Sequence, residues 1–154
     1  MASRIKPSRI DKLDNALRWT GIVLSILGVV DAIYLLVLKY TQAEAMCIGN
    51  HGCITVNNSP YSVIYGIPVS LLGLLAYLAI TAILLLESRW NLAAERGPLA
   101  VFGLSLTGVL FSAYLTYIEY FVIFAVCPFC IASAILITLI FLLSIIRLVR
   151  QPYP

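Results

Sequence analysis

Charged residues are scarce in this chain of 154 residues, where they make up 11% of the composition against 62% for hydrophobic residues. Soluble domains usually carry about 25% charged residues, and a chain of this length cannot bury so much apolar surface in one core. The scarcity of charge therefore excludes a soluble domain and predicts an all-α integral membrane protein.

Histidine and net charge are scarce too, with one histidine and a formal net charge of +3. The basic residues are spread around the predicted helix ends, so the composition gives no support for nucleic-acid binding. A metal site would have to combine His51 with Cys47 and Cys53, which are the ligand types that zinc accepts. That site stays open as an alternative, but an exposed loop histidine is the favoured interpretation of His51, and we expect no metal.

Four apolar stretches have roughly the length needed to cross a bilayer. They cover residues 17–40, 67–86, 99–121 and 127–148. We expect them to form one bundle of four transmembrane helices, between a basic cytoplasmic segment at 1–16 and a short tail at 149–154. Pro98 is expected to open the third helix. The one long polar stretch, residues 41–66, then becomes a loop between the first two helices.

The basic residues lie almost entirely at one end of these predicted spans. Lys39 alone lies at the other end. The remaining nine of the ten lie before the first span or at its start, between the second and the third, or at the end of the fourth and after it. The positive-inside rule then places both termini in the cytoplasm. All four cysteines of this multi-pass protein of the cell membrane would therefore lie on the extracytoplasmic side, where disulfides persist.

The motif Cys127-Pro128-Phe129-Cys130 stands where the fourth span begins. Proline suits the first turn of a helix because its missing N–H has no intrahelical partner there. A helix start also lowers the pKa of a cysteine, which favours the thiolate that exchanges disulfides. Cys47 and Cys53 are separated by five residues, enough to form a loop disulfide. The alternative is a non-enzymatic membrane protein with two structural disulfides.

Asp31 and the aromatic residues near the end of the third span are further candidates. A carboxyl group in the membrane costs about 2.5–3.5 kcal/mol, so Asp31 should face the bundle, either to relay protons or to bond a neighbouring helix. Tyr114 and Tyr117 either belong to an interfacial belt of aromatic residues or border a pocket for a flat ring.

An internal repeat at an offset of 80 residues relates the first and third spans, with nine identities in 24 positions. The identical pairs include Ser25 and Ser105, Gly28 and Gly108, and Cys47 and Cys127. Related units of this kind would run in the same direction and lead to cysteines at the same membrane face. The repeat therefore favours a relay between the two thiol pairs.

Five segments, in this order along the chain, resemble prokaryotic members of the vitamin K epoxide reductase family. They are Cys47-x5-Cys53, Asn58-Ser59-Pro60-Tyr61, the run from Gly66 to Gly73, the run from Tyr114 to Glu119, and Cys127-Pro128-Phe129-Cys130. The resemblance implies a four-helix bundle around a quinone of the ubiquinone or menaquinone type. It also implies that electrons pass from a thioredoxin-like, DsbA-like partner through the loop pair and the helix pair to the quinone, which supports disulfide formation outside the cytoplasm.

The resemblance also implies roles for single residues. Cys130, one turn deeper than Cys127, is expected to face the quinone, while Cys127 exchanges with one of the two loop cysteines. Which of Cys47 and Cys53 meets Cys127 stays open. The candidate quinone contacts are Ser59, Tyr114, Tyr117 and Phe129.

The end of the chain at Pro154 leads us to expect a separate partner protein rather than a fused thioredoxin-like domain. Val69 and Ala134 stand where the animal enzymes carry an amide and a tyrosine, which favours simple quinone reduction over epoxide reduction. A quinone-linked oxidase of the disulfide bond protein B (DsbB) type would perform nearly the same reaction. That family places its Cys-x-x-Cys before its separated pair, the reverse of the order here.

Overall fold

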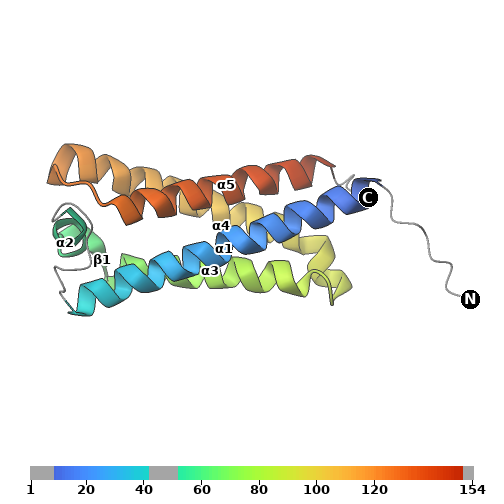
Figure 1. The fold of residues 1–154 in the computed structure, drawn as a ribbon, viewed down its shortest axis with the longest axis horizontal. Coiled ribbons are helices and arrows are strands. Elements are labelled where there is room, and N and C mark those ends of the chain that lie inside the picture. Colours follow the sequence, from blue (N-terminus) through green and yellow to red (C-terminus); the bar gives the residue numbers. More distant parts are fainter. Residues whose placement is uncertain (1–8, 42–51, 151–154) are drawn as a thin grey trace, which may run out of the picture.

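The computed structural model describes residues 9–41 and 52–150. The elements in chain order are α1 (Arg9–Thr41), α2 (Gly52–Asn57), the 3-10 helix η2 (Pro60–Ser62), β1 (Val63–Ile64), β2 (Ile67–Pro68), α3 (Val69–Leu86), α4 (Asn91–Ile118), the π-helical turn η3 (Glu119–Ile123) and α5 (Pro128–Arg150). Within the described residues, α1, α3, α5 and α4 together with η3 are four helices long and apolar enough to cross a membrane. They lie side by side as a bundle (Figure 1), which confirms the predicted membrane fold.

The two ends of the bundle differ in what they contain. Figure 1 shows that α1 begins and α5 ends at the same end, where α3 also turns into α4. At the opposite end, α2 and β1 lie against the helices. We call residues 52–68, which include α2, η2 and the short antiparallel pair β1–β2, the cap.

Helix boundaries differ from the expected spans mainly at the end of the bundle opposite the cap. Helix α1 begins at Arg9, inside the segment expected as a separate lead-in, and α4 begins at Asn91. Pro98, which we expected to open the third helix, lies inside α4 at its eighth position. Residues 92–96 are good helix formers that extend the helix beyond its apolar part. Hydropathy alone therefore places the start of this helix too late.

The internal repeat has a counterpart in how the helices pack. Gly28 on α1 lies against the ring of Tyr77 on α3, so closely that a Cβ atom at position 28 would overlap it. Gly108 on α4 occupies the matching place, where a Cβ would lie 2.7 Å from Cγ1 of Ile137 on α5. Small residues allow close helix contact in membrane proteins. Helices α1 and α3 thus pair in the same way as α4 and α5.

Hydroxyl groups add hydrogen bonds between the paired helices and across the bundle. Thr81 on α3 donates to Ser25 Oγ on α1 at 2.9 Å. The Tyr77 hydroxyl donates to the backbone oxygen of Ser133 on α5 at 2.8 Å. These bonds fix the relative positions of α1, α3 and α5 in the apolar interior, where hydrogen-bond partners are scarce.

The outer surface of the bundle is apolar. Exposed large side chains are found on every long helix and include Val30, Leu75, Leu110 and Ile135. Such an apolar surface is unfavourable in water and favourable in the hydrocarbon region of a bilayer. The surface therefore agrees with four helices that contact lipid.

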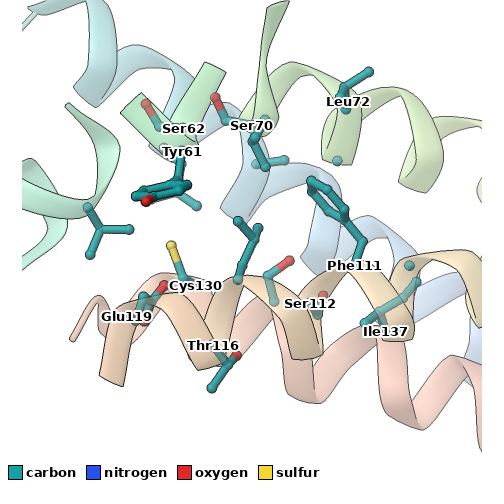
Figure 2. Close-up of a pocket in the computed structure, with 18 of the residues that line it drawn as sticks. Tyr61, Ser62, Ser70, Leu72, Phe111, Ser112, Thr116, Glu119, Cys130 and Ile137 are labelled. Carbon is teal, nitrogen blue, oxygen red and sulfur yellow. The ribbon is translucent and has the colours of Figure 1, made fainter. Parts of the chain in front are cut away.

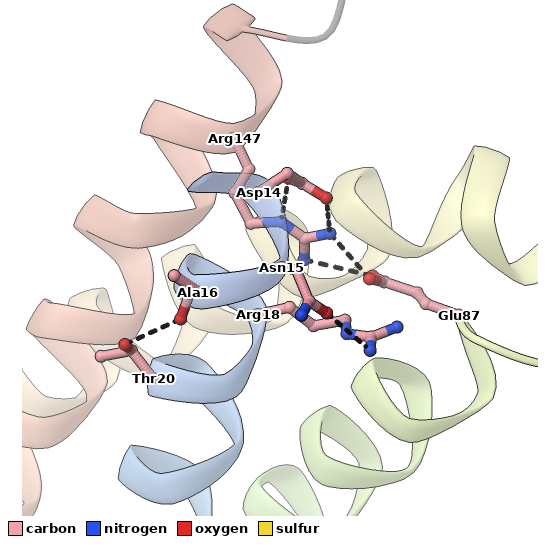
Figure 3. Close-up of polar contacts among 7 residues, drawn as sticks. All are labelled: Asp14, Asn15, Ala16, Arg18, Thr20, Glu87 and Arg147. Carbon is pink, nitrogen blue, oxygen red and sulfur yellow. Dashed lines mark hydrogen bonds and ion pairs between the residues drawn. The ribbon is translucent and has the colours of Figure 1, made fainter. Parts of the chain in front are cut away.

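A buried ionic cluster joins the helices at the end opposite the cap (Figure 3). Arg147 on α5 donates to Glu87 at 2.8 Å and to Asp14 on α1 at 3.0 Å. A Cβ at Gly97 on α4 would lie 2.5 Å from Oε1 of Glu87. The carboxylate of Glu87 therefore packs directly against α4, and the cluster touches all four long helices.

Candidate functional site

Cys127 and Cys130 lie at the start of α5, as the motif predicts. Pro128 is the first residue of the helix, and Ile131 donates its backbone N–H to the Cys127 oxygen at 3.2 Å. Cys127 thus occupies the capping position, where its carbonyl accepts the first helical hydrogen bond. Its side chain is 0% exposed and packs with Leu35 and Leu38 of α1. Both cysteines carry free thiols.

The π-helical turn η3 brings a carboxylate to this helix start. Phe124 ends the turn with a left-handed backbone (φ 53°), and Ala125 donates its N–H to the Glu119 oxygen at 3.2 Å. The chain then folds back, so that the Cys127 N–H donates to Oε2 of Glu119 at 3.4 Å. Isolated π-helical turns occur frequently at functional sites.

The thiol pair has an electrostatic asymmetry. Hydrogen bonds from the Cys130 thiol, and from the backbone of Cys130 and Phe129, lower the pKa of Cys127. Together they outweigh burial and the nearby Glu119 carboxylate, which raise it. The thiolate of Cys127 is therefore favoured relative to an ordinary cysteine. A thiolate is the species that attacks and exchanges disulfides, so this arrangement suits thiol–disulfide chemistry.

A cavity of about 410 Å³ lies between the four long helices and the cap. Its polar lining consists of Asn57, Ser59, Tyr61, Ser62, Ser70, Tyr77, Thr107, Ser112, Thr116, Glu119, Cys130 and Ser133. Its other lining residues are apolar and include Leu35, Val69, Leu72, Leu104, Phe111, Leu115 and Ile137. The cavity is thus mostly apolar, with hydroxyl groups at intervals around its wall.

Cys130 lines this cavity and Cys127 does not. In Figure 2 the sulfur of Cys130 points into the cavity, and Ser70 lies on the opposite wall, on α3. The Ser70 hydroxyl is buried and has no hydrogen-bond partner among the described residues. The cavity therefore offers a reactive sulfur on one side and an unused hydrogen-bond donor on the other.

The cap is tied to α1 above the cavity. Lys39 donates hydrogen bonds to the Asn57 oxygen and to Ser62 Oγ, both at 2.8 Å. Asn57 in turn donates its side-chain N–H to the Leu35 oxygen at 2.8 Å. Because Asn57 and Ser62 also line the cavity, these bonds hold one wall of the cavity in place.

The structure brings only part of the expected contact set to the cavity. Ser59 lines it, and its hydroxyl donates to the Val56 oxygen at 2.7 Å. Tyr114 and Tyr117 are exposed on the outside of the bundle and lie outside the lining. Phe129 also lies outside the lining and packs on Tyr34, with ring centroids 4.5 Å apart.

Several lining residues escaped the sequence reasoning, among them Tyr61, Ser70, Phe111, Ser112 and Thr116. The available sequence signal for these cavity residues was the presence of hydroxyl side chains in otherwise apolar helices. That signal is weak, because many such hydroxyls bond the backbone of their own helix.

Some expected residues cannot be placed at the cavity. Cys47 and His51 lie outside the described residues, so the loop disulfide and the metal site there stay predictions. Cys53 falls in the first turn of α2, and its side chain is not part of the description. Asp31 does not line the cavity, and its Oδ2 is buried without a hydrogen-bond partner among the described residues.

Comparison with known proteins identifies the family of this chain. The model of the vitamin K epoxide reductase family matches residues 19–145. Thiol-disulfide oxidoreductase LTO1 of Arabidopsis thaliana is 34% identical over 121 residues, which cover 75% of this chain and 32% of that protein. The chain thus spans about a third of the length of the curated relative that it matches.

Proposed function

The chain belongs to the vitamin K epoxide reductase family, and we propose that it is a membrane thiol–disulfide oxidoreductase that passes electrons from Cys127 and Cys130 to a quinone. The observation that carries this proposal is the place of Cys130, whose sulfur faces a cavity of about 410 Å³ between four membrane-length helices. The name of the relative, a thiol-disulfide oxidoreductase, supports the same class of reaction.

The residues around the cavity fit a quinone. The ring of a quinone is flat and apolar, which suits the apolar lining and the rings of Phe111 and Tyr61. Its two carbonyl oxygens accept hydrogen bonds, and the buried Ser70 hydroxyl has no partner among the described residues. An unsatisfied buried polar group costs about 1–3 kcal/mol. A carbonyl oxygen near Ser70 would remove that cost, so Ser70 would hold one oxygen of the quinone.

The chemistry of the chain is the oxidation of a dithiol. Cys127 is favoured as thiolate because Cys130 donates a hydrogen bond to it, which lowers the pKa of Cys127. On oxidation the two sulfur atoms form a disulfide, and their electrons leave through Cys130 into the cavity. A bound quinone supplies a two-electron acceptor there.

Electrons must also enter the site. We infer that Cys47 and Cys53 form the loop pair that reduces the Cys127–Cys130 disulfide. A thioredoxin-like, DsbA-like protein outside the cytoplasm would in turn reduce the loop pair. The contact between the two thiol pairs is supported by α2, which carries Cys53 and packs against the start of α5. The place of the loop pair outside the cytoplasm is supported by Lys39, the single basic residue near the cap end of the spans. Both termini are then cytoplasmic by the positive-inside rule.

The experiment that tests this function uses the purified protein in lipid nanodiscs. A reduced thioredoxin-like donor and an analogue of ubiquinone or menaquinone are added, and quinol formation is followed by absorbance. We expect turnover with the native protein and a background rate with Cys130→Ser. Thr138→Ser, an exposed position on the same helix, is the matched control and should keep the native rate. A background rate for the native protein with both quinones would reject the proposal.

A further inference from the structure

Glu119 is a carboxylate placed directly at the reacting thiols. Its residue is 3% exposed, and it lines the cavity together with Cys130. It accepts a hydrogen bond from the Cys127 N–H at 3.4 Å and another from the Cys130 thiol. Among the acidic residues that the structure describes, no other lines this cavity. Figure 2 shows Glu119 beside Cys130 at the end of the cavity near the cap.

The proton on Cys130 presents a chemical problem that this placement solves. The Cys130 thiol has one proton and two acceptors in contact with it, the Glu119 carboxylate and the sulfur of Cys127, and on the path to Cys127 this proton lies between the two sulfur atoms. A disulfide requires these atoms to approach to about 2.05 Å. The proton must therefore leave the gap as the bond forms, and it needs an acceptor that already contacts the same thiol. The Glu119 carboxylate contacts this thiol and meets that requirement.

We propose that Glu119 is a catalytic residue that takes the Cys130 thiol proton as the disulfide forms and donates it to a quinone oxygen. This step rests on the function proposed above. The S–H bond of Cys130 breaks, a bond between the two sulfur atoms forms, and two electrons pass to the quinone. Glu119 delivers one proton to a quinone oxygen. Water supplies the second, which replaces the proton that Cys127 released when it became a thiolate.

Other groups near Cys130 are poorly suited to this role. Tyr61 and Thr116 carry hydroxyl groups, which are weak bases at neutral pH. Asp31 lies outside the lining of the cavity. The bond from the Cys127 N–H orients the Glu119 carboxylate, so the acceptor is held in place before the reaction.

The first test separates proton transfer from a purely structural role. Glu119→Gln keeps an oxygen for the Cys127 N–H but cannot take up a proton at neutral pH. We expect quinol formation by this variant to fall about a hundredfold or more, the usual range for loss of an acid–base group, with little change in the KM for quinone. Glu119→Asp should recover a large part of the rate. Glu95→Gln, the same change at an exposed site on α4, should keep the native rate.

The second test needs no quinone. With Cys47, Cys53 and Cys127 replaced by serine, Cys130 is the only thiol of the chain, and its S–H stretching band is read by infrared spectroscopy. Hydrogen bonds to a charged acceptor are stronger than those to a neutral one, so the band should move to higher wavenumber in Glu119→Gln and stay in place in Glu95→Gln. An equal band position with and without Glu119 would overturn the proposal, because the proton contact would be absent.

The outcomes distinguish this step from the function on which it rests. A native protein without quinone turnover would reject the function and the step together. A native protein that turns over quinone, with Glu119→Gln equally fast, would reject only the role of Glu119. A slow Glu119→Gln protein that still forms the Cys127–Cys130 disulfide with a chemical oxidant shows an intact fold and supports the proton transfer.

Discussion

Arg147 and Glu87 form an ion pair of 2.8 Å although their side chains are only 5% and 3% exposed. Glu87 follows the last residue of α3, and Arg147 lies in the last turn of α5. Asp14 of α1 binds the same guanidinium group at 3.0 Å. Two helix ends that are far apart in the sequence are thus connected by an ion pair.

We expect Arg147→Met to destabilise the protein by about 3–5 kcal/mol, because it leaves the Glu87 carboxylate buried without its cation. Burial raises the pKa of Glu87 and the hydrogen bond from Arg147 opposes that rise, so the variant should raise this pKa further. As the pH falls, Glu87 of the folded variant is then protonated at a higher pH than Glu87 of the unfolded chain. Protonation removes the buried charge, so the stability of the variant should recover at low pH. Unfolding in mixed micelles measures this. A second replacement, Glu87→Leu, should restore most of the loss, and a single variant as stable as the native protein would contradict the prediction.

Ser70→Ala should weaken quinone binding without harming the fold. The lost hydroxyl has no partner among the described residues, and one net hydrogen bond is worth about 0.5–1.5 kcal/mol. We therefore expect the KM for quinone to rise about two- to tenfold, with unchanged or slightly higher thermal stability. Ser88→Ala, at an exposed site between α3 and α4, is the control. A lower melting temperature with an unchanged KM would show that Ser70 serves packing instead.

The ionisation of Cys127 should depend on a hydrogen-bond donor at position 130. The bond from the Cys130 thiol is the largest cause of the lowered pKa of Cys127. Thiolate should therefore persist at a lower pH than in an ordinary cysteine. Cys130→Ala should move its titration to higher pH, whereas Cys130→Ser, which keeps a donor, should move it less. The measurement is the ultraviolet absorbance of the thiolate as a function of pH. The signal of Cys127 is obtained by subtracting the absorbance of the same variant that also carries Cys127→Ser. Identical titrations for the two variants would exclude the hydrogen bond as the cause.

Cys53 should be the loop cysteine that reaches Cys127. It precedes Val56 by one turn on α2, and Val56 packs against the cluster that contains Cys127. In the variant Cys130→Ser with Cys47→Ser, mild oxidation should join Cys53 to Cys127, because the mixed disulfide can no longer be resolved. Cleavage between α3 and α4 would show two fragments joined until reductant is added. The variant Cys130→Ser with Cys53→Ser, which retains Cys47, should give no linked fragments. Linked fragments in this variant alone would show that Cys47, and not Cys53, reaches Cys127.

The orientation in the membrane can be read by labelling. Tyr65→Cys lies in the cap, where the native side chain is 101% exposed, and Ser88→Cys lies at the other end of the bundle. In a background without native cysteines, an impermeant maleimide should label position 65 in intact cells and leave position 88 unlabelled, because basic loops stay inside. Labelling of position 88 alone would invert the proposed topology.

The four helices were predictable because an apolar stretch of about twenty residues, in a chain with few charges, is typical of a transmembrane helix. Which face of each helix contacts lipid and which lines the cavity was not predictable. Tyr114 and Tyr117 stand on an apolar helix whose inner and outer sides both suit aromatic residues, so no periodicity separates lipid from cavity. The sequence therefore located Cys130 and Ser59 near the cavity but assigned two tyrosines to it that face outward.

Short-range backbone geometry accounts for the other differences. The π-helical turn that ends at Phe124 redirects Glu119 toward the start of α5, and no pattern in the sequence marks such a turn. Pro98 looked like a helix start because proline favours the first turn. The helix instead continues past it, with Pro98 almost fully buried.

The burial of Cys127 has a consequence for the cell as a whole. Cys127 is 0% exposed, and Cys130 is only partly exposed and faces the cavity. Small soluble thiols and oxidants should therefore react more slowly with this pair than with an exposed cysteine. Under the proposed function, the pair would exchange electrons mainly with molecules that dock at the cap or dissolve in the lipid.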